Sequence, residues 1–536
     1  MLYQHRVQGW RRTVLIATQL VGLLFSTLDA SIVSTSLVSM AIDLQDFLNA
    51  PWVVLSYLLA YLGLTIGVAK LSDIYGRREM LCLSWALFAG FSIGCGCATN
   101  MTQLIICRAF QGIGGSGLYS LGQIVLFEVG PRDKPSLMGA LVGITLAVSY
   151  VLGPILGGII SSITTWRWVF WINIPFGVAT VTLMYLSWPA VIDTQKKGWD
   201  SVRKIDVIGI TSILLACALL VFPLQEAGSY TYAWDSPVIV TAFSIAGLSW
   251  VVFFAWEIYL GLVISTRIEP ILPLRLVFRR VYVVCVICTL CTGLIYLSIL
   301  VILPERFQIV NGDNALYAGI HLLPMLGATA FGAFLAGTIS HKRNNTSWTL
   351  MAAQVFQLIG VSLLSMLKDV TTETKAQYGY QVPLGFGIGL SLGAATIMAS
   401  VQSQRTDLAV AQGAVAQARV FGGSIGIALC TIIFNTMVTK DLSSLMDPDD
   451  IAALHHSPTI APWLPDDIQF RVRTVYASAF TEDIFVMIGI AAFGLVVSAF
   501  AYEKHPPPMP SVQQAKEVVG IDGHSETELD ELVSVR

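Results

Sequence analysis

Long apolar stretches, separated by short polar connections, repeat along almost the whole chain. The hydrocarbon core of a bilayer is about 30 Å thick, so a helix needs about 20 mainly apolar residues to cross it. Because lipid offers no hydrogen-bond partners, a crossing segment must satisfy its own backbone, as an α-helix does. Fourteen stretches have this character, and they cover residues 14–38, 51–71, 80–98, 103–127, 136–160, 167–188, 206–223, 237–260, 281–303, 315–339, 347–367, 379–400, 413–437 and 481–502. The pattern predicts an all-α polytopic membrane protein.

Positive charge is distributed unevenly between the polar connections. If the N-terminus is cytoplasmic, the short inner connections contain fifteen lysines and arginines and the outer ones contain six. Cytoplasmic loops of membrane proteins carry the excess of these residues. We therefore expect residues 1–13 to form a cytoplasmic tail. Because the number of spans is even, residues 503–536 are expected to form a second, disordered cytoplasmic tail, and the long connection 438–480 to lie outside.

The composition excludes several classes of protein. Hydrophobic residues make up 55% of the 536 positions and charged residues 12%, whereas soluble domains contain about 25% charged residues. The formal net charge is −3, so nothing points to a nucleic-acid partner. All nine cysteines lie inside apolar stretches, and no phosphate-binding loop or nucleophile–base arrangement is present. We expect no catalytic residues, no metal and no cofactor.

A charged loop joins the second and third apolar stretches. It combines an acid, a turn glycine and two arginines: Asp73, Gly76, Arg77 and Arg78. Charges at this spacing can form networks at the ends of helices and thereby lock or release neighbouring bundles. A positive anchor with a turn on the cytoplasmic side is the alternative.

Two spans contain unusual residues in their interiors. In the fifth span, Pro154 removes one helical donor and bends the helix, while Gly153 and Gly157 allow another backbone to approach closely. An ordinary packing motif is the alternative. In the fourth span, Arg108 precedes a glycine-rich segment. A charge inside a span costs about 2.5–3.5 kcal/mol or more, so Arg108 should face the interior unless it extends to the interface.

Together these motifs resemble the major facilitator superfamily, and within it the fourteen-span drug:H+ antiporter family, which includes fungal multidrug and toxin efflux pumps. The resemblance covers residues 14–502 and includes an aromatic string, residues 166–177, that opens the sixth span. That string alone is also explained as an interfacial anchor. The sequence departs from the family at Ala69, where the family has glycine, and at Val38, where it has proline.

The resemblance implies both an architecture and roles for residues. Two six-helix bundles, residues 14–188 and 281–502, would pack together, with two helices inserted in a linker of residues 189–280. The family associates an arginine in the fourth span with proton coupling, so Arg108 takes that role. The charged loop, the fifth-span motif and Arg419 of the thirteenth span are assigned to gating, and the fifth-span motif is typical of antiporters.

Asp29, in the first span, is predicted to lie at the same depth as Arg108. At about 1.5 Å per residue, Asp29 is about 22 Å from the inner end of its span, and Arg108 is about 8 Å from the outer end of its own. In a core about 30 Å thick, both lie about 8 Å below the outer surface. We expect Asp29 to take up a proton when the cavity faces outward, with Arg108 adjusting its proton affinity. A permanent structural bridge is the alternative.

Other polar and aromatic residues receive weaker assignments. Glu128 and Glu257 are expected to extend to the membrane interface, and His321 to be a satisfied polar residue of the core. Aromatic and amide side chains that suit amphipathic organic molecules are candidates for a substrate cavity. They are Phe25, Tyr57, Tyr61, Gln111, Tyr296, Gln308, Phe331 and Asn435. Ordinary helix packing is the alternative for each of them.

These expectations describe a monomeric, proton-coupled exporter of amphipathic drugs, toxins or secondary metabolites in the plasma membrane of a fungal cell. Its partners would be membrane lipid, a small amphipathic organic substrate and H+. The vacuolar membrane is the alternative location. A proton-coupled importer of a siderophore or nutrient is a second possibility, against which the fifth-span motif argues. A non-transporting sensor or scaffold is a third, and the presence of Asp29, Arg108 and Asp73 weighs against it.

Overall fold

The computed structural model describes residues 9–130, 135–188, 206–262, 268, 270–340, 343–367, 375–403, 407–443 and 466–507. Within these ranges the secondary structure is helical and contains no strand. The first helices are α1 (Trp10–Asp43), α2 (Ala50–Tyr75), α3 (Arg77–Gly96), α4 (Met101–Val129), α5 (Pro135–Ile163), α6 (Trp168–Trp171) and α7 (Asn173–Ser187). The others are α8 (Val207–Gly228), α9 (Pro237–Leu262), α10 (Leu274–Val277), α11 (Arg280–Ile309), α12 (Ala315–His321), α13 (Leu323–Ile339), α14 (Thr346–Leu364), α15 (Ala376–Gln402), α16 (Leu408–Leu442) and α18 (Asp466–Ala499).

The helices coincide with the predicted apolar stretches. Eleven segments are long and apolar enough to cross a membrane, and α12 with α13 forms a further span that is bent by 40°. Two more predicted stretches coincide with α2 and α4, which are 26 and 29 residues long. The described helices are therefore compatible with fourteen spans, and the all-α membrane fold is confirmed.

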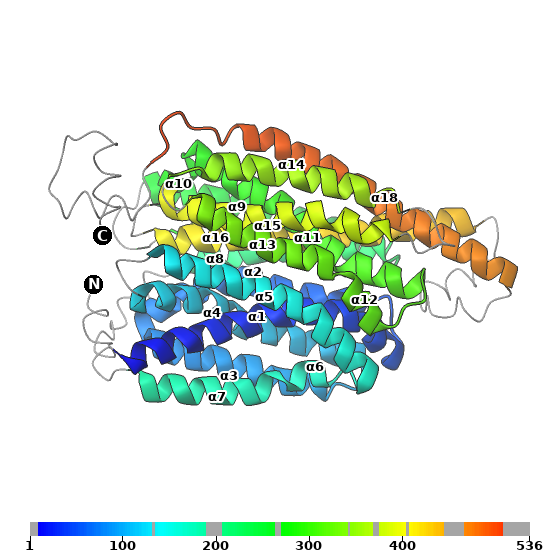
Figure 1. Ribbon diagram of the computed structural model, residues 1–536, viewed down its shortest axis with the longest axis horizontal. Helices are drawn as coiled ribbons and strands as arrows, with labels where there is room; N and C mark the ends of the chain where they lie inside the picture. Colours follow the sequence, from blue (N-terminus) through cyan, green and yellow to red (C-terminus); the bar gives the residue numbers. More distant parts are fainter. Residues whose placement is uncertain are drawn as a thin grey trace.

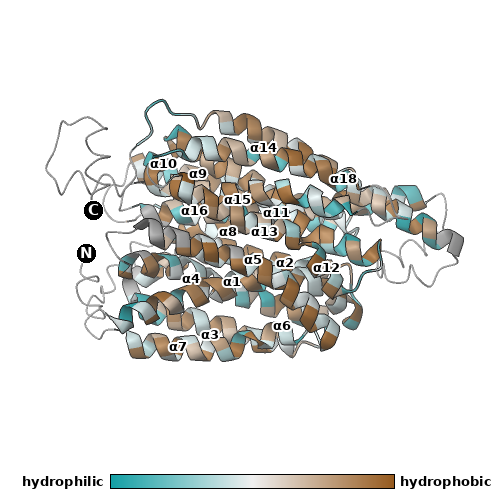
Figure 2. Cartoon of the chain, in the orientation of Figure 1, coloured by the Kyte–Doolittle hydropathy of each residue, from teal (hydrophilic) through white to brown (hydrophobic). Residues whose placement is uncertain are grey.

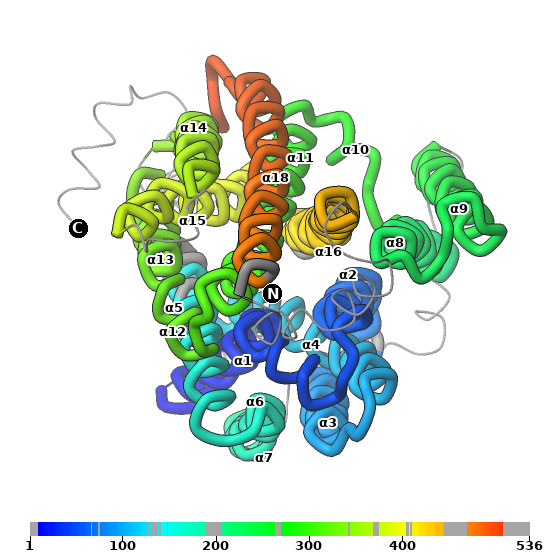
Figure 3. The backbone as a smooth tube through the Cα atoms, turned by 90° about the vertical axis from the view of Figure 1, so that its right-hand side faces the viewer, coloured from blue at the N-terminus to red at the C-terminus, as the bar shows by residue number. Residues whose placement is uncertain are grey.

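The long helices lie side by side in one bundle (Figure 1). Because α1 starts and α18 ends at the same end of this bundle, we name it the terminal end and the opposite one the distal end. Seen from the distal end, α1 to α7 gather on one side and α11 to α18 on the other, with α8 and α9 beside them (Figure 3). Residues 1–8 and 508–536 of the expected tails, and 444–465 of the long connection, lie outside the described residues.

The outer surface of the bundle is apolar along its length. Figure 2 shows hydrophobic residues along the helices and hydrophilic residues gathered toward the two ends. On α9, for example, Leu248 is 63% exposed and Val251 is 65% exposed. Large exposed apolar side chains in the middle of long helices fit lipid as the surrounding medium.

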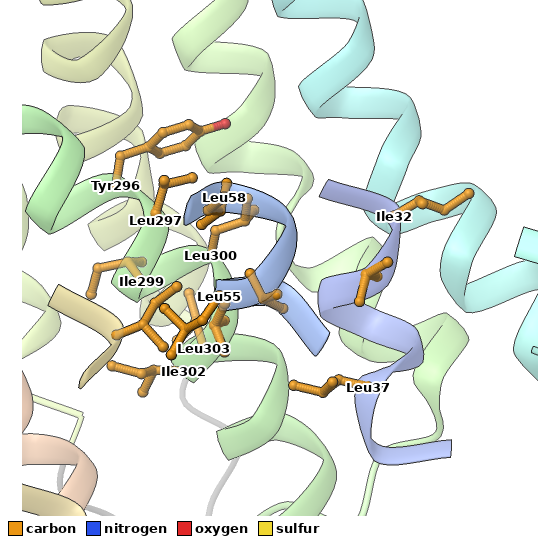
Figure 4. Packing of buried hydrophobic residues seen from close by; sticks show 14 of the residues in the cluster. Ile32, Leu37, Leu55, Leu58, Tyr296, Leu297, Ile299, Leu300, Ile302 and Leu303 are labelled. Atoms are coloured by element: carbon orange, nitrogen blue, oxygen red, sulfur yellow. The ribbon is translucent and has the colours of Figure 1, made fainter. Parts of the chain in front are cut away.

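The two groups of helices share a buried core. Leu300 and Leu303 of α11 lie against Leu55 and Leu58 of α2 (Figure 4), and all four belong to one buried cluster. Leucines at intervals of three residues stay on one face of a helix, so α2 and α11 can bury the same stripe against each other.

The inserted helix α8 contacts both groups. On the side of the first group, the Trp52 indole donates a hydrogen bond of 2.7 Å to Glu226 of α8. On the side of the second group, the Asn435 amide donates a hydrogen bond of 2.9 Å to the carbonyl oxygen of Gly228. The insert is therefore attached to both bundles through polar contacts near the end of α8.

Several helices extend beyond the ends that the sequence predicted, and two of these extensions, in α11 and α18, contain acidic residues. Helix α11 continues through Pro304 to Ile309, whereas the predicted span ends at residue 303. A proline removes only one helical hydrogen bond, so α11 continues past it. Helix α18 begins at Asp466, whereas the predicted span begins at residue 481. Both extensions place acidic residues, Glu305 and Asp483, within helices rather than in loops or at a helix start.

Candidate functional site

An ion pair without solvent exposure joins α1 to α4. Arg108 directs Nη1 to Oδ2 of Asp29, and both side chains are 0% exposed. The structure thus brings together the two residues that the helical rise per residue predicted to lie at the same depth in the membrane. A role in proton coupling stays a prediction.

Neutral side chains from three other positions complete the surroundings of the Asp29 carboxylate. The Gln111 amide donates a hydrogen bond of 2.9 Å to Asp29 Oδ1, and the Asn173 amide donates one of 3.1 Å to the same oxygen. The hydroxyl oxygen of Ser92 accepts from both amides, at 2.8 and 3.1 Å. Helices α1, α3, α4 and α7 therefore all contribute to one polar network inside the first bundle.

The guanidinium group of Arg108 has a second set of contacts away from Asp29. Its Nε donates a hydrogen bond of 3.0 Å to the carbonyl oxygen of Val53. It also lies over the ring of Tyr57, at 4.2 Å from the centroid, and 5.6 Å from that of Phe170. A cation over an aromatic face is attracted by the ring. Within the described part of the chain, Nη2 has no hydrogen-bond partner.

The electrostatic consequence follows from the burial. A single charge in this apolar interior is strongly destabilising, whereas two opposite charges with hydrogen-bond partners compensate each other. Any movement that separates α1 from α4 therefore changes how favourable it is for Asp29 to carry a charge. The network can in this way link protonation of one carboxyl group to the arrangement of four helices.

The charged loop ties the terminal end of the first bundle together. Gly76 has φ of 104°, a left-handed conformation that favours glycine, and it separates α2 from α3. Arg77 Nη2 lies 3.1 Å from Oε1 of Glu128 on α4, and Arg77 also donates to Ser72. Glu128 therefore pairs with Arg77 near the end of α4, and its side chain is 30% exposed, so its extension to the interface stays a prediction. The side chain of Asp73 lies outside the described residues.

Arg78 of the same loop reaches a different helix. Its guanidinium lies over the ring of Tyr185 on α7, at 5.1 Å from the centroid. It also lies 3.5 Å from the carboxylate of Glu79. The two arginines thus hold α4 and α7 from one loop, and a role in gating remains a prediction.

The fifth-span motif packs directly on the first helix. A Cβ on Gly153 would lie 1.9 Å from the hydroxyl of Ser31, and one on Gly157 would lie 2.3 Å from a backbone oxygen of α1. Only glycine fits such distances without separating the helices. The Thr35 hydroxyl donates a hydrogen bond of 3.1 Å to the carbonyl oxygen of Pro154. The motif therefore packs α5 closely against α1.

Arg419 lies on α16 at the side of the second bundle that faces the first. It is 6% exposed, and within the described part of the chain it forms no ion pair. It lies close enough to Tyr150 and Tyr296 to interact with them electrostatically. A Cβ on Gly293 of α11 would lie 2.0 Å from the carbonyl oxygen of Arg419, so α11 and α16 pack closely here. Its assignment to gating is neither supported nor opposed by these contacts.

A cavity of about 120 Å³ lies between the two bundles at the distal end. Its walls come from α1, α2 and the connection between them, from α11, α16 and α18, and from Ser229, which follows α8. Its lining is mostly apolar, with two acidic residues, and consists of Leu37, Val38, Ala41, Phe47, Leu48, Ala50, Pro51, Ser229, Val301, Ile302, Glu305, Ile309, Ile427, Cys430, Thr431, Phe434, Asn435, Phe480 and Asp483.

Of the eight residues predicted for a substrate cavity, Asn435 lines this one. Gln111 and Tyr57 instead surround the ion pair. Phe25 packs on Phe176 with ring centroids 4.8 Å apart, and Phe331 is 59% exposed on α13. For these four residues the structure supports packing or network roles.

The other three predicted residues make local contacts. Tyr61 meets Tyr119 edge to face at 5.6 Å, and Tyr296 meets Tyr150 at 5.2 Å. The Gln308 amide donates a hydrogen bond of 3.3 Å to the carbonyl oxygen one helical turn earlier. None of the three lines the distal cavity.

Glu257 and His321 both have polar contacts inside the protein. Glu257 is 3% exposed and accepts hydrogen bonds from the backbone of Ile271 and Leu272, at 3.1 and 3.3 Å. The expectation that it extends to the interface is therefore wrong, because it holds the connection before α11. His321 lies 3.1 Å from the carboxylate of Asp313, which gives it a polar neighbour.

Sequence reasoning missed several members of the two sites. Asn173 stands in the aromatic string, where neighbouring tryptophans suggested an interfacial anchor. Ser92 stands in an apolar stretch without a charged neighbour. Glu305 and Asp483 lay at or beyond predicted span ends. For Glu305 and Asp483, the one signal in the sequence was an acidic side chain within a few residues of the end of an apolar stretch.

The fold and its buried polar network define a membrane transporter with two helical bundles around a shared interface. Residues 20–427 match the family described as the Major Facilitator Superfamily, and the chain belongs to that superfamily.

Several named proteins are similar to this chain. It is 36% identical over 515 residues to the MFS-type transporter FPY5 of Fusarium mangiferae, across 94% of this chain and 85% of that protein. It is 26% identical over 496 residues to the rubrofusarin-specific efflux pump aurT of Gibberella zeae, across 91% and 89%. It is 30% identical over 423 residues to multidrug resistance protein 3 of Bacillus subtilis, across 78% of each. Efflux pumps are thus among its relatives.

A solved structure shares the fold at low sequence identity. The bacterial homolog to the human lysosomal transporter Spinster, in its inward-facing and unoccupied conformation, matches with a TM-score of 0.62 and 13% identity. The match covers 93% of this chain and 100% of that one. At this identity the likeness bears on the fold alone.

Proposed function

We propose that this transporter exports small amphipathic organic molecules in exchange for protons. The observation that carries the proposal is the Asp29–Arg108 pair, which is sealed from solvent and shared between two helices. Two relatives whose names describe efflux or multidrug resistance support the direction. The proposed location is the plasma membrane, with the terminal end of the bundle in the cytoplasm.

The proposed cycle uses the compensation between the two charges. With α1 and α4 in contact, Arg108 stabilises the Asp29 carboxylate. When the bundles rock and the pair opens toward the outer side, the carboxylate loses its compensating charge and gains access to water, so it takes up a proton. When the bundles rock the other way, the site opens toward the inner side, Arg108 returns to the carboxyl group, and the proton leaves into water on that side before the pair is sealed again. Each proton that enters supplies about 2.3 kcal/mol per 100 mV of membrane potential.

Transport by the purified protein in liposomes with an imposed pH gradient tests this proposal. A panel of amphipathic compounds is added, and dissipation of the gradient is followed with a pH-sensitive dye. We expect substrate-dependent proton movement by the wild type and loss of that movement in Asp29→Asn. The control is Asp235→Asn, which changes an exposed acid in the connection between α8 and α9.

Three results would contradict the proposal. Transport by Asp29→Asn at the wild-type rate and with an unchanged pH dependence would remove Asp29 from coupling. Substrate and protons that move in the same direction would indicate an importer. The absence of flux for every compound, in a folded protein, would favour a sensor or scaffold. Resistance of a pump-deficient yeast that expresses the chain, and its loss when the proton gradient is collapsed, provides the cellular counterpart.

A further inference from the structure

Two acidic residues from different helices of the second bundle line the distal cavity. Glu305 comes from α11 and Asp483 from α18. Asp483 is 1% exposed, and neither of its carboxylate oxygens has a hydrogen-bond partner among the described residues. Glu305 is close enough to interact with it electrostatically. Buried carboxylates in proteins normally have partners, so Asp483, with a second acid beside it, requires an explanation.

The remainder of the lining offers no compensating charge. The described residues around the cavity include no lysine, arginine or histidine. They do include Phe47, Phe434 and Phe480, and the rings of the last two lie 4.8 Å apart. A buried carboxylate without a partner, such as Asp483, favours a cation in apolar surroundings, and aromatic faces attract cations further. Electrostatics and ring chemistry therefore point to the same kind of occupant.

We propose that the distal cavity binds the cationic group, a protonated amine or quaternary ammonium, of an otherwise apolar substrate. Glu305 and Asp483 supply the negative charge, and the phenylalanines contact the apolar part next to it. This inference rests on the proposed function, because it names the class of molecule that the transporter carries. It also places the proton and the cationic group of the substrate at different sites, since the Asp29 network lies in the first bundle and the acidic pair in the second.

The size of the cavity sets what it can hold in this state. An engineered apolar cavity of about 150 Å³ accommodates one benzene molecule. A cavity of about 120 Å³ therefore suits one ammonium group or one small ring, not a whole drug-sized molecule. The remainder of a larger substrate would lie between the bundles. A small aromatic ammonium ion is accordingly the appropriate probe.

Calorimetric titration of the purified, detergent-solubilised full chain tests the inference. The probe is benzyltrimethylammonium, and its matched anion is phenylmethanesulfonate. We expect the wild type to bind the ammonium ion and not the sulfonate. The double variant Glu305→Gln/Asp483→Asn is expected to bind the ammonium ion about tenfold more weakly or worse. Asp235→Asn is the control, because this exposed acid lies in the connection between α8 and α9 and does not line the cavity. Size-exclusion profiles and melting temperatures establish that each variant is folded.

The outcomes separate this inference from the proposed function. Unchanged ammonium binding by a folded double variant would overturn the inference, as would equal binding of the sulfonate or no binding of either probe by the wild type. Acid-dependent ammonium binding in a protein without proton-coupled flux would support the cation site while contradicting the exchange mechanism. Asp29-dependent flux together with unchanged ammonium binding by the double variant would support the exchange mechanism and contradict the cation site.

Discussion

Arg108→Gln is expected to destabilise the protein more than the double variant Asp29→Asn/Arg108→Gln does. The single substitution leaves the Asp29 carboxylate buried without its compensating charge. The double substitution removes both charges and leaves amide groups that can hydrogen-bond to one another. A second substitution should therefore restore part of the stability that the first one removes.

The structure gives the scale of this effect. Asp29 is 0% exposed at the side chain and accepts hydrogen bonds from Arg108, from Gln111 at 2.9 Å and from Asn173 at 3.1 Å. In Arg108→Gln two neutral donors remain for a full negative charge. Removing one partner of a buried pair costs about 3–5 kcal/mol. We expect the double variant to be more stable than Arg108→Gln by about 2 kcal/mol.

Denaturant-induced unfolding in mixed micelles at neutral pH, followed by circular dichroism, measures these differences. The control pair is Arg167–Asp43, which lies 2.8 Å apart with side chains 28% and 48% exposed. Its disruption by Arg167→Gln should cost about 1 kcal/mol or less, because water screens exposed charges. If the double variant were as unstable as Arg108→Gln, or less stable, the pair would not compensate charge as described.

Three further predictions concern helix contacts. Gly157→Leu should severely reduce both folded yield and transport, because a Cβ there would lie 2.3 Å from the α1 backbone. The control is Gly143→Ala, where a Cβ would have no atom within 4 Å. It should leave both quantities unchanged in size-exclusion and flux measurements. Gly76→Ala should lower the free energy of unfolding by about 1–2 kcal/mol, because residue 76 has a positive φ. A denaturation curve that coincides with that of the wild type would contradict this. Arg77→Glu should slow transport, and adding Glu128→Arg should restore much of the rate if the 3.1 Å contact is an ion pair that acts in the cycle. A double variant as slow as the single one would argue against that role.

The sequence predicts the spans well because the bilayer imposes a length on each apolar stretch. It also predicts that Asp29 and Arg108 share a depth, since helical rise alone fixes that coordinate. Depth does not fix which way a helix turns its side chains. That is why Phe331, at a plausible depth, lies 59% exposed on the outside, and why Gln111 joins the ion-pair network rather than a cavity.

The acidic cavity escaped prediction for a related reason. Pro304 suggests a helix end, yet α11 includes it and carries Glu305 inside the helix. Asp483 stood in the first turn of a predicted span, whereas α18 begins seventeen residues before it. The convergence of two helices that are distant in sequence depends on tertiary packing, which no local pattern contains.

The attachment of α8 to both bundles has a mechanical consequence. The Trp52–Glu226 and Asn435–Gly228 hydrogen bonds anchor one end of α8 to α2 and to α16. If the bundles swing apart at the distal end, that helix cannot follow both partners, so one of the two bonds must lengthen or break. The inserted pair therefore acts as a strut that sets how wide the molecule opens on that side.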